Sequence, residues 1–126
     1  MLIDTDILIW VFRGNGKAAR LVDEEEERKI SAVTYMEIIQ GARNRGELRQ
    51  IKAFLSDYGF QVVPLSENIG HRASIYVEEY GLSMALSVPD ALIAATAVEN
   101  HLTLCTGNRK HYGPIKDLLL KPFRPG

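Results

Sequence analysis

The stretch MLIDTDILIWVF at residues 1–12 decides the fold, because an apolar strand, an acidic turn and an apolar helix follow one another in it. The run Met1 to Ile3 predicts a short strand, and a helix is expected around Ile7 to Phe12. All six residues of that helical stretch are apolar, so the helix is either deeply buried or covers an interface. We expect burial within the monomer.

Helical and strand patterns alternate along the rest of the chain. Further helices are expected at Lys17 to Glu26, Tyr35 to Ala42, Glu47 to Asp57 and Glu67 to Tyr80, and further strands near Lys29 to Val33, Phe60 to Pro64, Leu102 to Cys105 and Leu118 to Leu120. Pro89 opens one more helix, because proline is favoured in a first helical turn. Strands separated by helices predict an α/β/α sandwich with a central, mainly parallel sheet of about five strands.

Length and composition predict one globular domain spanning residues 1–126, without linkers or repeats. Hydrophobic residues make up 46% of the chain and charged residues 25%, which excludes a disordered tail or a fibre. The longest apolar run, Ile7 to Phe12, is far too short to cross a bilayer, and no charged region precedes it as in a signal peptide. We therefore expect a cytoplasmic protein without a membrane partner.

The formal net charge of -1 does not by itself indicate a partner that is a polyanion. One acidic run, Asp23 to Glu27, hides an excess of basic residues in the rest of the chain. A basic cluster that could contact RNA phosphates comprises Arg43, Arg45, Arg49 and Lys52. Ordinary solvated helix faces explain the same cluster equally well.

Acidic side chains follow three of the predicted elements at points that a parallel sheet would bring together. Asp4 directly follows the first strand, Glu37 lies one helical turn after the second, and Asp90 lies in the first turn of the helix at Pro89. Ligand sites in such sheets lie at the carboxyl ends of the strands. A few convergent carboxylates suffice to hold Mg²⁺, which suits phosphodiester hydrolysis. Three further polar candidates follow the strand that contains Cys105, namely Thr106, Asn108 and His111.

Each acid also has a purely structural interpretation. Asp4 or Asp6 could cap the first helix, and Asp90 would be favoured by the dipole of its helix in any protein. The spacing of Thr34 and Glu37 matches a capping box, in which Glu37 would bond back to the Thr34 backbone. The residues taken singly leave both interpretations open.

Four segments taken together resemble the PIN-domain ribonucleases, and more narrowly the VapC-type toxins of toxin-antitoxin pairs. They are LIDTDILI, SAVTYMEIIQGA, VPDALIAATA and LCTGNRKHYGPI, and they stand in the family's order and at family-like spacing across essentially the whole chain. The third segment is the most specific match. The resemblance implies a PIN-like fold.

The first three segments carry family site residues onto this chain. The resemblance places Asp4, Glu37 and Asp90 in the acidic centre, with Thr5 beside Asp4. Asp6 occupies a position that is often polar in the family.

The fourth segment departs from the simplest family pattern, in which an acid follows the Thr-x-Asn motif. Thr106 and Asn108 are present, but His111 stands where that acid is expected. A neutral imidazole could touch a second metal or a water, and an imidazolium could meet phosphate. The fourth carboxylate ligand is therefore in doubt.

The resemblance implies an Mg²⁺- or Mn²⁺-dependent endoribonuclease that acts as the toxin of a type II toxin-antitoxin system. In the mechanism we hypothesise, Asp4 and Asp90 bind the metal, while Glu37 completes its shell or orients the attacking water. Thr106 and Asn108 would position Asp4. The implied partners are RNA, a cognate antitoxin that covers the acids, and a second copy of the chain.

Two other classes of function stay open at this point. A non-catalytic module could bind RNA or a protein partner on the same scaffold. A haloacid-dehalogenase-type phosphatase also uses Asp-x-Asp after its first strand, which Asp4 and Asp6 match. No downstream acidic pair accompanies that motif, so this alternative is the weaker one.

Overall fold

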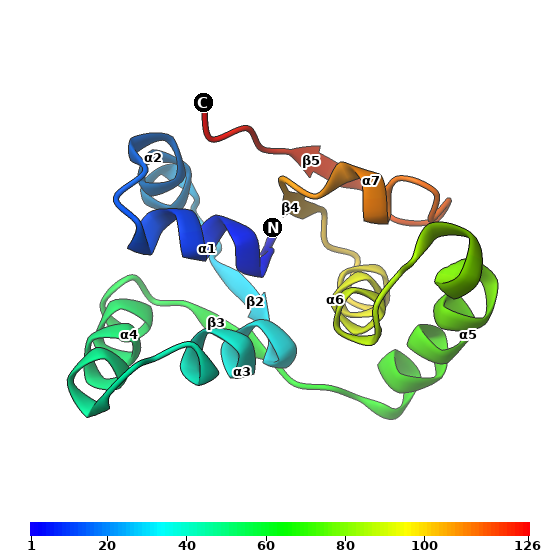
Figure 1. The fold of residues 1–126 in the computed structure, drawn as a ribbon, viewed down its shortest axis with the longest axis horizontal. Helices are drawn as coiled ribbons and strands as arrows, with labels where there is room; N and C mark the ends of the chain where they lie inside the picture. The colour runs from blue at the N-terminus through cyan, green and yellow to red at the C-terminus, as the bar shows by residue number, and fades with distance from the viewer.

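Five parallel strands form one central sheet in the order β3-β2-β1-β4-β5. The computed structural model describes all 126 residues, and Figure 1 shows helices on both sides of this sheet. The strands are β1 (Leu2–Ile3), β2 (Lys29–Ser31), β3 (Gln61–Val63), β4 (Leu104–Thr106) and β5 (Leu120–Pro122). The predicted α/β/α sandwich is confirmed.

Seven helices connect and flank the strands. They are α1 (Thr5–Phe12), α2 (Gly16–Glu24), α3 (Ala32–Gln40), α4 (Arg45–Asp57), α5 (Glu67–Met84), α6 (Val88–Glu99) and α7 (Arg109–Tyr112), of which only α7 was not predicted. Side-chain caps explain several of the starts, because Asn15, Asn44, Ser66 and Ser87 each accept a hydrogen bond from the backbone N–H three residues later. No helix combines the length and apolar character needed to span a membrane.

Successive residues of β1 and β4 point to opposite faces of the sheet and enter two separate cores. Leu2 and Leu104 pack in the core built with α5 and α6, whereas Ile3 and Cys105 pack in the core built with α1 and α2. Both strands are fully buried, as expected for the centre of a parallel sheet. The carboxyl ends of these two strands are thereby held rigidly side by side.

The boundary between β2 and α3 differs from the prediction. The strand ends at Ser31, whose hydroxyl accepts from the N–H of Val33 and caps α3. Thr34 therefore lies inside the helix and is fully buried, so the capping-box interpretation of Thr34 and Glu37 is wrong. Glu37 is free to make a contact outside its own helix.

Burial of the all-apolar helix α1 is also only partly as expected. Ile7 and Leu8 are fully buried, but Ile9 is 39% exposed and Phe12 42% exposed. One face of α1 thus contacts the core, and the other borders an open groove described below.

Candidate active site

The sheet has a switch point between β1 and β4. From β1 the chain adds β2 and β3 on one side, and β4 and β5 lie on the other. Open α/β sheets bind ligands in the crevice beyond the carboxyl ends of the strands at such a point. Asp4 follows β1 directly and Thr106 ends β4, so both lie at this crevice.

Asp4 is a buried carboxylate fixed by two hydrogen bonds. It is 4% exposed and is the N-cap of α1, where Oδ1 accepts from the Thr5 N–H at 2.8 Å. Its Oδ2 accepts from the Thr106 hydroxyl at 2.6 Å. Burial, then the negative charges of Asp6 and Asp90, raise the pKa of Asp4 from 3.8 to about 7. Helix capping therefore accounts for Oδ1 alone, because Oδ2 is bound by the last residue of β4.

Asp6 lies one residue into α1 and points to the same end of β4. Its Oδ2 accepts from the Gly107 N–H at 2.9 Å, while its Oδ1 is buried without any hydrogen-bond partner. Burial and the charge of Asp90 raise its pKa, although its bond to Gly107 opposes that shift. An unpaired buried carboxylate oxygen is costly unless a cation or a water meets it.

Glu37 is connected to the first residue of α1 through the Thr5 hydroxyl. The Thr5 Oγ1 lies 2.7 Å from Glu37 Oε1 and 2.9 Å from Thr34 Oγ1. Because Thr5 has one hydroxyl proton, it donates to Glu37 while Thr34 donates to Thr5. This chain fixes one oxygen of Glu37 beside the residue that follows Asp4.

Asp90 lies in the first turn of α6 and is bonded by α7. Tyr112 donates its phenol proton to Oδ1 at 3.2 Å, and His111 Nδ1 lies 3.3 Å from Oδ2. The same His111 nitrogen is 3.0 Å from the Asn108 side-chain amide. One tautomer of His111 therefore accepts from Asn108, and the other donates to Asp90. Asn108 also donates its backbone N–H to the Thr106 hydroxyl at 2.9 Å.

The predicted residues thus form one connected network around the switch point. Oxygen donors from Asp4, Asp6 and Asp90 suit a hard divalent cation such as Mg²⁺. No group of three or more acidic, histidine or cysteine side chains is gathered closely enough to hold a metal by itself. Mg²⁺ typically takes one or two carboxylates and completes its shell with water and phosphate, so a partial protein shell still fits it.

Three contributors to this network were not predicted as site residues, namely Thr34, Gly107 and Tyr112. Gly107 donates its backbone N–H to Asp6, and a Cβ at this position would lie only 2.8 Å from Asp6 Oδ2. Tyr112 is fully buried, and burial together with the charges of Asp4 and Asp90 raises its pKa. The need of a buried phenol for a hydrogen-bond partner is the signal that could have indicated Tyr112.

The basic residues predicted to contact RNA lie on or next to α4. Arg43 is engaged with Glu47, its Nη2 lying 2.8 Å from Oε2. The side chains of Arg45, Arg49 and Lys52 are exposed on α4. The structure does not bring these residues into the hydrogen-bonded network of the acids.

An open groove of about 750 Å³ runs beside Glu37 between α1, α3 and α4. Ile9, Phe12 and Phe54 supply apolar lining, and Arg13 lies at its edge with the Arg43–Glu47 pair. The groove therefore combines exposed apolar surface with charged groups next to one of the acids.

Comparison with known proteins places this geometry in a family. Residues 1–113 match the PIN domain. Ribonuclease VapC1 of Methanocaldococcus jannaschii is 30% identical over 124 residues, which cover 98% of this chain and 86% of that protein. Ribonuclease VapC19 of Mycobacterium tuberculosis is 32% identical over 122 residues, which cover 93% of this chain and 95% of that protein.

Solved structures agree with these sequence relatives. A toxin-antitoxin complex from Klebsiella pneumoniae contains a chain that is 31% identical, with a TM-score of 0.80 and coverage of 99% of this chain and 97% of that one. A DNA-bound VapBC from Salmonella typhimurium has a TM-score of 0.81 at 18% identity, covers 96% of both chains, and supports the fold alone.

Proposed function

Because the chain belongs to the PIN domain family, we propose that it is a metal-dependent endoribonuclease acting as the toxin of a type II toxin-antitoxin pair. Relatives named ribonuclease VapC that align over nearly the whole chain support this proposal. The observation that carries the site assignment is the bond from Thr106 to the buried Asp4 carboxylate. Family membership also sets aside the phosphatase alternative, since Asp4 and Asp6 stand here in a PIN-domain context.

Asp4 and Asp90 would hold Mg²⁺ or Mn²⁺, and Glu37 would complete the shell or orient the attacking water. A cation held there would neutralise charge on the transferring phosphoryl group and would lower the pKa of the attacking water. Asp6 would offer an additional carboxylate in a chain where His111 stands in place of the expected acid. This supplementary role follows from its buried, unpartnered Oδ1.

The surrounding residues would hold the carboxylates of the acids in position. Thr106 fixes one oxygen of Asp4, and Tyr112 fixes one oxygen of Asp90. Thr5 donates to one oxygen of Glu37, which leaves the other oxygen to accept a proton from a water. Groups that hold metal ligands in place commonly change metal affinity or activity tenfold to a hundredfold when replaced.

The partner proposed for the groove beside Glu37 is a segment of the cognate antitoxin. The 31%-identical structure is that of a toxin-antitoxin complex, which supports an antitoxin partner for this chain. Ile9, Phe12 and Phe54 would bury apolar area against such a segment, and its occupancy would cover Glu37.

A homodimer is also proposed. Apolar side chains are exposed where α5 ends and α6 begins, including Leu82, Met84 and Val88. A second copy of the chain would remove this apolar area from water. Light scattering coupled to size exclusion measures the mass in solution, and a monomer at micromolar concentration would reject this proposal.

Cleavage of a mixed RNA pool by purified, antitoxin-free protein tests the ribonuclease. We expect cutting with Mg²⁺ or Mn²⁺ that is lost in EDTA and lost in Asp4→Asn. Asp23→Asn, at an exposed position on α2, is the matched control and should cut normally. Folded protein that leaves varied RNAs intact with either metal would favour a binding role instead.

A further inference from the structure

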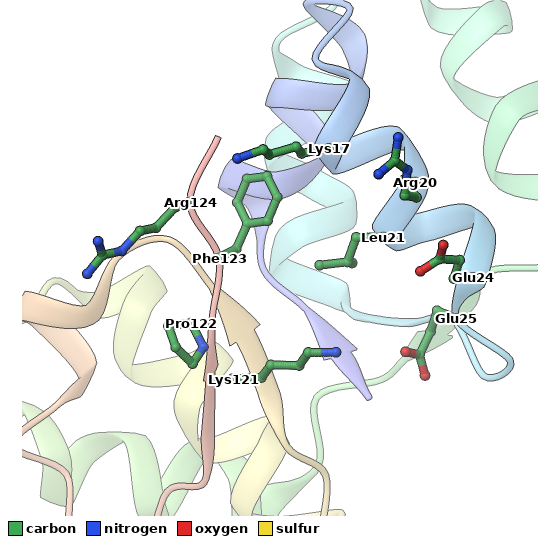
Figure 2. A pocket seen from close by; sticks show the side chains of 9 residues that line it. All are labelled: Lys17, Arg20, Leu21, Glu24, Glu25, Lys121, Pro122, Phe123 and Arg124. Carbon is green, nitrogen blue, oxygen red and sulfur yellow. The ribbon is translucent and has the colours of Figure 1, made fainter. Parts of the chain in front are cut away.

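Two adjoining hollows lie where β5 passes between α2 and α7. The larger, of about 520 Å³, is shown in Figure 2, and the smaller is about 290 Å³. They share Pro122, Phe123 and Arg124, so they adjoin along this segment and together make one basic surface. We call it the basic groove, because six cations line it, namely Lys17, Arg20, Arg109, Lys110, Lys121 and Arg124.

Cations outnumber acids in the lining of the basic groove by six to two. All six side chains are exposed, and none takes part in any of the five ion pairs of the structure. Lys17 donates only to the backbone carbonyl of Gly126, at 3.1 Å. The two acids of the lining are Glu24, the last residue of α2, and its C-cap Glu25; they lie on the side of Arg20 and Lys121, away from Lys17 and Arg124 (Figure 2).

The basic groove leads to the acidic network. Gly107 and Asn108 line its smaller hollow, and they are the residues that bond Asp6 and contact His111. Phe123 follows β5 and donates its N–H to the Thr106 carbonyl at 2.8 Å. This bond fixes the segment shared by the two hollows against the end of β4. A bound chain could therefore pass from these cations to the acids along one surface.

The lining favours a nucleic acid over a protein as the occupant. Of the nine residues around the larger hollow only two are hydrophobic, and Phe123 is mostly buried. A protein partner requires apolar or aromatic anchor pockets, whereas a phosphate backbone requires cations at intervals along its path. The basic groove supplies such cations and lacks apolar anchor pockets.

We propose that the basic groove holds the phosphate backbone of single-stranded RNA and directs it to the acids at the carboxyl ends of β1 and β4. This proposal rests on the ribonuclease function proposed above. It assigns substrate contacts to α2, α7 and β5 rather than to α4, whose cations Arg45, Arg49 and Lys52 line neither hollow.

RNA affinity in a cleavage-silent background tests the assignment. In Asp4→Asn protein, the groove triple Arg20→Gln, Lys121→Gln and Arg124→Gln is compared with the α4 triple Arg45→Gln, Arg49→Gln and Lys52→Gln. Both triples remove two arginines and one lysine from exposed positions, so the change in net charge is matched. Fluorescence anisotropy with a labelled mixed-sequence RNA of about 16 nucleotides gives Kd over a salt series. Circular dichroism verifies that both triples are folded.

The groove triple should bind at least about tenfold more weakly, and the slope of log Kd against log salt should fall by about 2. The α4 triple should change Kd less than about threefold. Equal losses in the two triples, a larger loss in the α4 triple, or no salt-dependent RNA binding by the Asp4→Asn parent would overturn the proposal.

The two proposals fail in distinguishable ways. If the wild-type chain cuts RNA while the groove triple keeps its affinity, the groove assignment is wrong and the ribonuclease stands. If RNA binds through the groove but no metal supports cutting, the ribonuclease is wrong and the groove assignment stands.

Discussion

Replacing Asp4 by asparagine should stabilise the metal-free protein, and more so at pH 8 than at pH 5. The pKa of Asp4 rises from 3.8 to about 7, first because of burial and then because of Asp6. The folded protein therefore binds this proton more tightly than the unfolded chain. Its free energy of unfolding consequently falls as pH rises between those two values. Asparagine has nearly the same shape and carries no charge, so the free energy of unfolding of the variant does not fall in this way as pH rises.

The size of the effect follows from the same two pKa values. The difference between these two pKa values costs the folded protein about 4 kcal/mol of stability at pH 8 and about 2 kcal/mol at pH 5. Asparagine accepts through only one of its two terminal atoms, so one of the bonds from Thr5 and Thr106 is lost at about 1 kcal/mol. The net gain is therefore about 3 kcal/mol at pH 8 and about 1 kcal/mol at pH 5.

Urea unfolding in EDTA, followed by the fluorescence of Trp10, measures both values. Asp23→Asn removes an exposed aspartate from α2 and should change stability by less than about 0.5 kcal/mol at either pH. A gain in Asp4→Asn that is equal at the two pH values would refute the argument, as would the absence of any gain.

Three further substitutions test individual contacts. Gly107→Ala places a Cβ 2.8 Å from Asp6 Oδ2. It should lower the RNA cleavage rate about a hundredfold with an unchanged circular dichroism spectrum. A normal rate would show that Asp6 is not part of the site. Tyr112→Phe removes the donor to Asp90 and should weaken Mn²⁺ binding, measured by calorimetry, at least about tenfold; unchanged binding would make this contact purely structural. Arg28→Gln removes donors to three backbone carbonyls near the ends of α2 and α4, and urea unfolding should show a loss of about 2 kcal/mol with cleavage retained.

The architecture was predictable because apolar runs and proline positions are local signals. The strands at β1 and β4 and the helix at Pro89 needed no tertiary information. The start of α3 was mispredicted because Ser31 and Thr34 are both acceptable caps, and only burial of Thr34 within the packed helix decides between them. Local patterns do not distinguish two such candidates three residues apart.

The candidate site was predictable to the extent that it follows the carboxyl ends of strands. That rule alone predicts that Asp4, Thr106 and Asn108 lie close together. The bond from Thr5 to Glu37 spans 32 residues, and the donor to Asp6 is a backbone N–H, so neither has a local sequence signature. Clustering in sequence likewise drew attention to α4, whereas the cations of the basic groove come from three separate elements.

The most direct measurement is the single-turnover rate of RNA cleavage as Mn²⁺ is titrated into the wild-type protein and into Asp90→Asn. We expect a rate that saturates with metal in the wild type and falls at least about a thousandfold in the variant, with the fold unchanged. Cleavage that persists in EDTA, or an Asp90→Asn protein that cuts at the wild-type rate, would contradict the proposed carboxylate-held metal site.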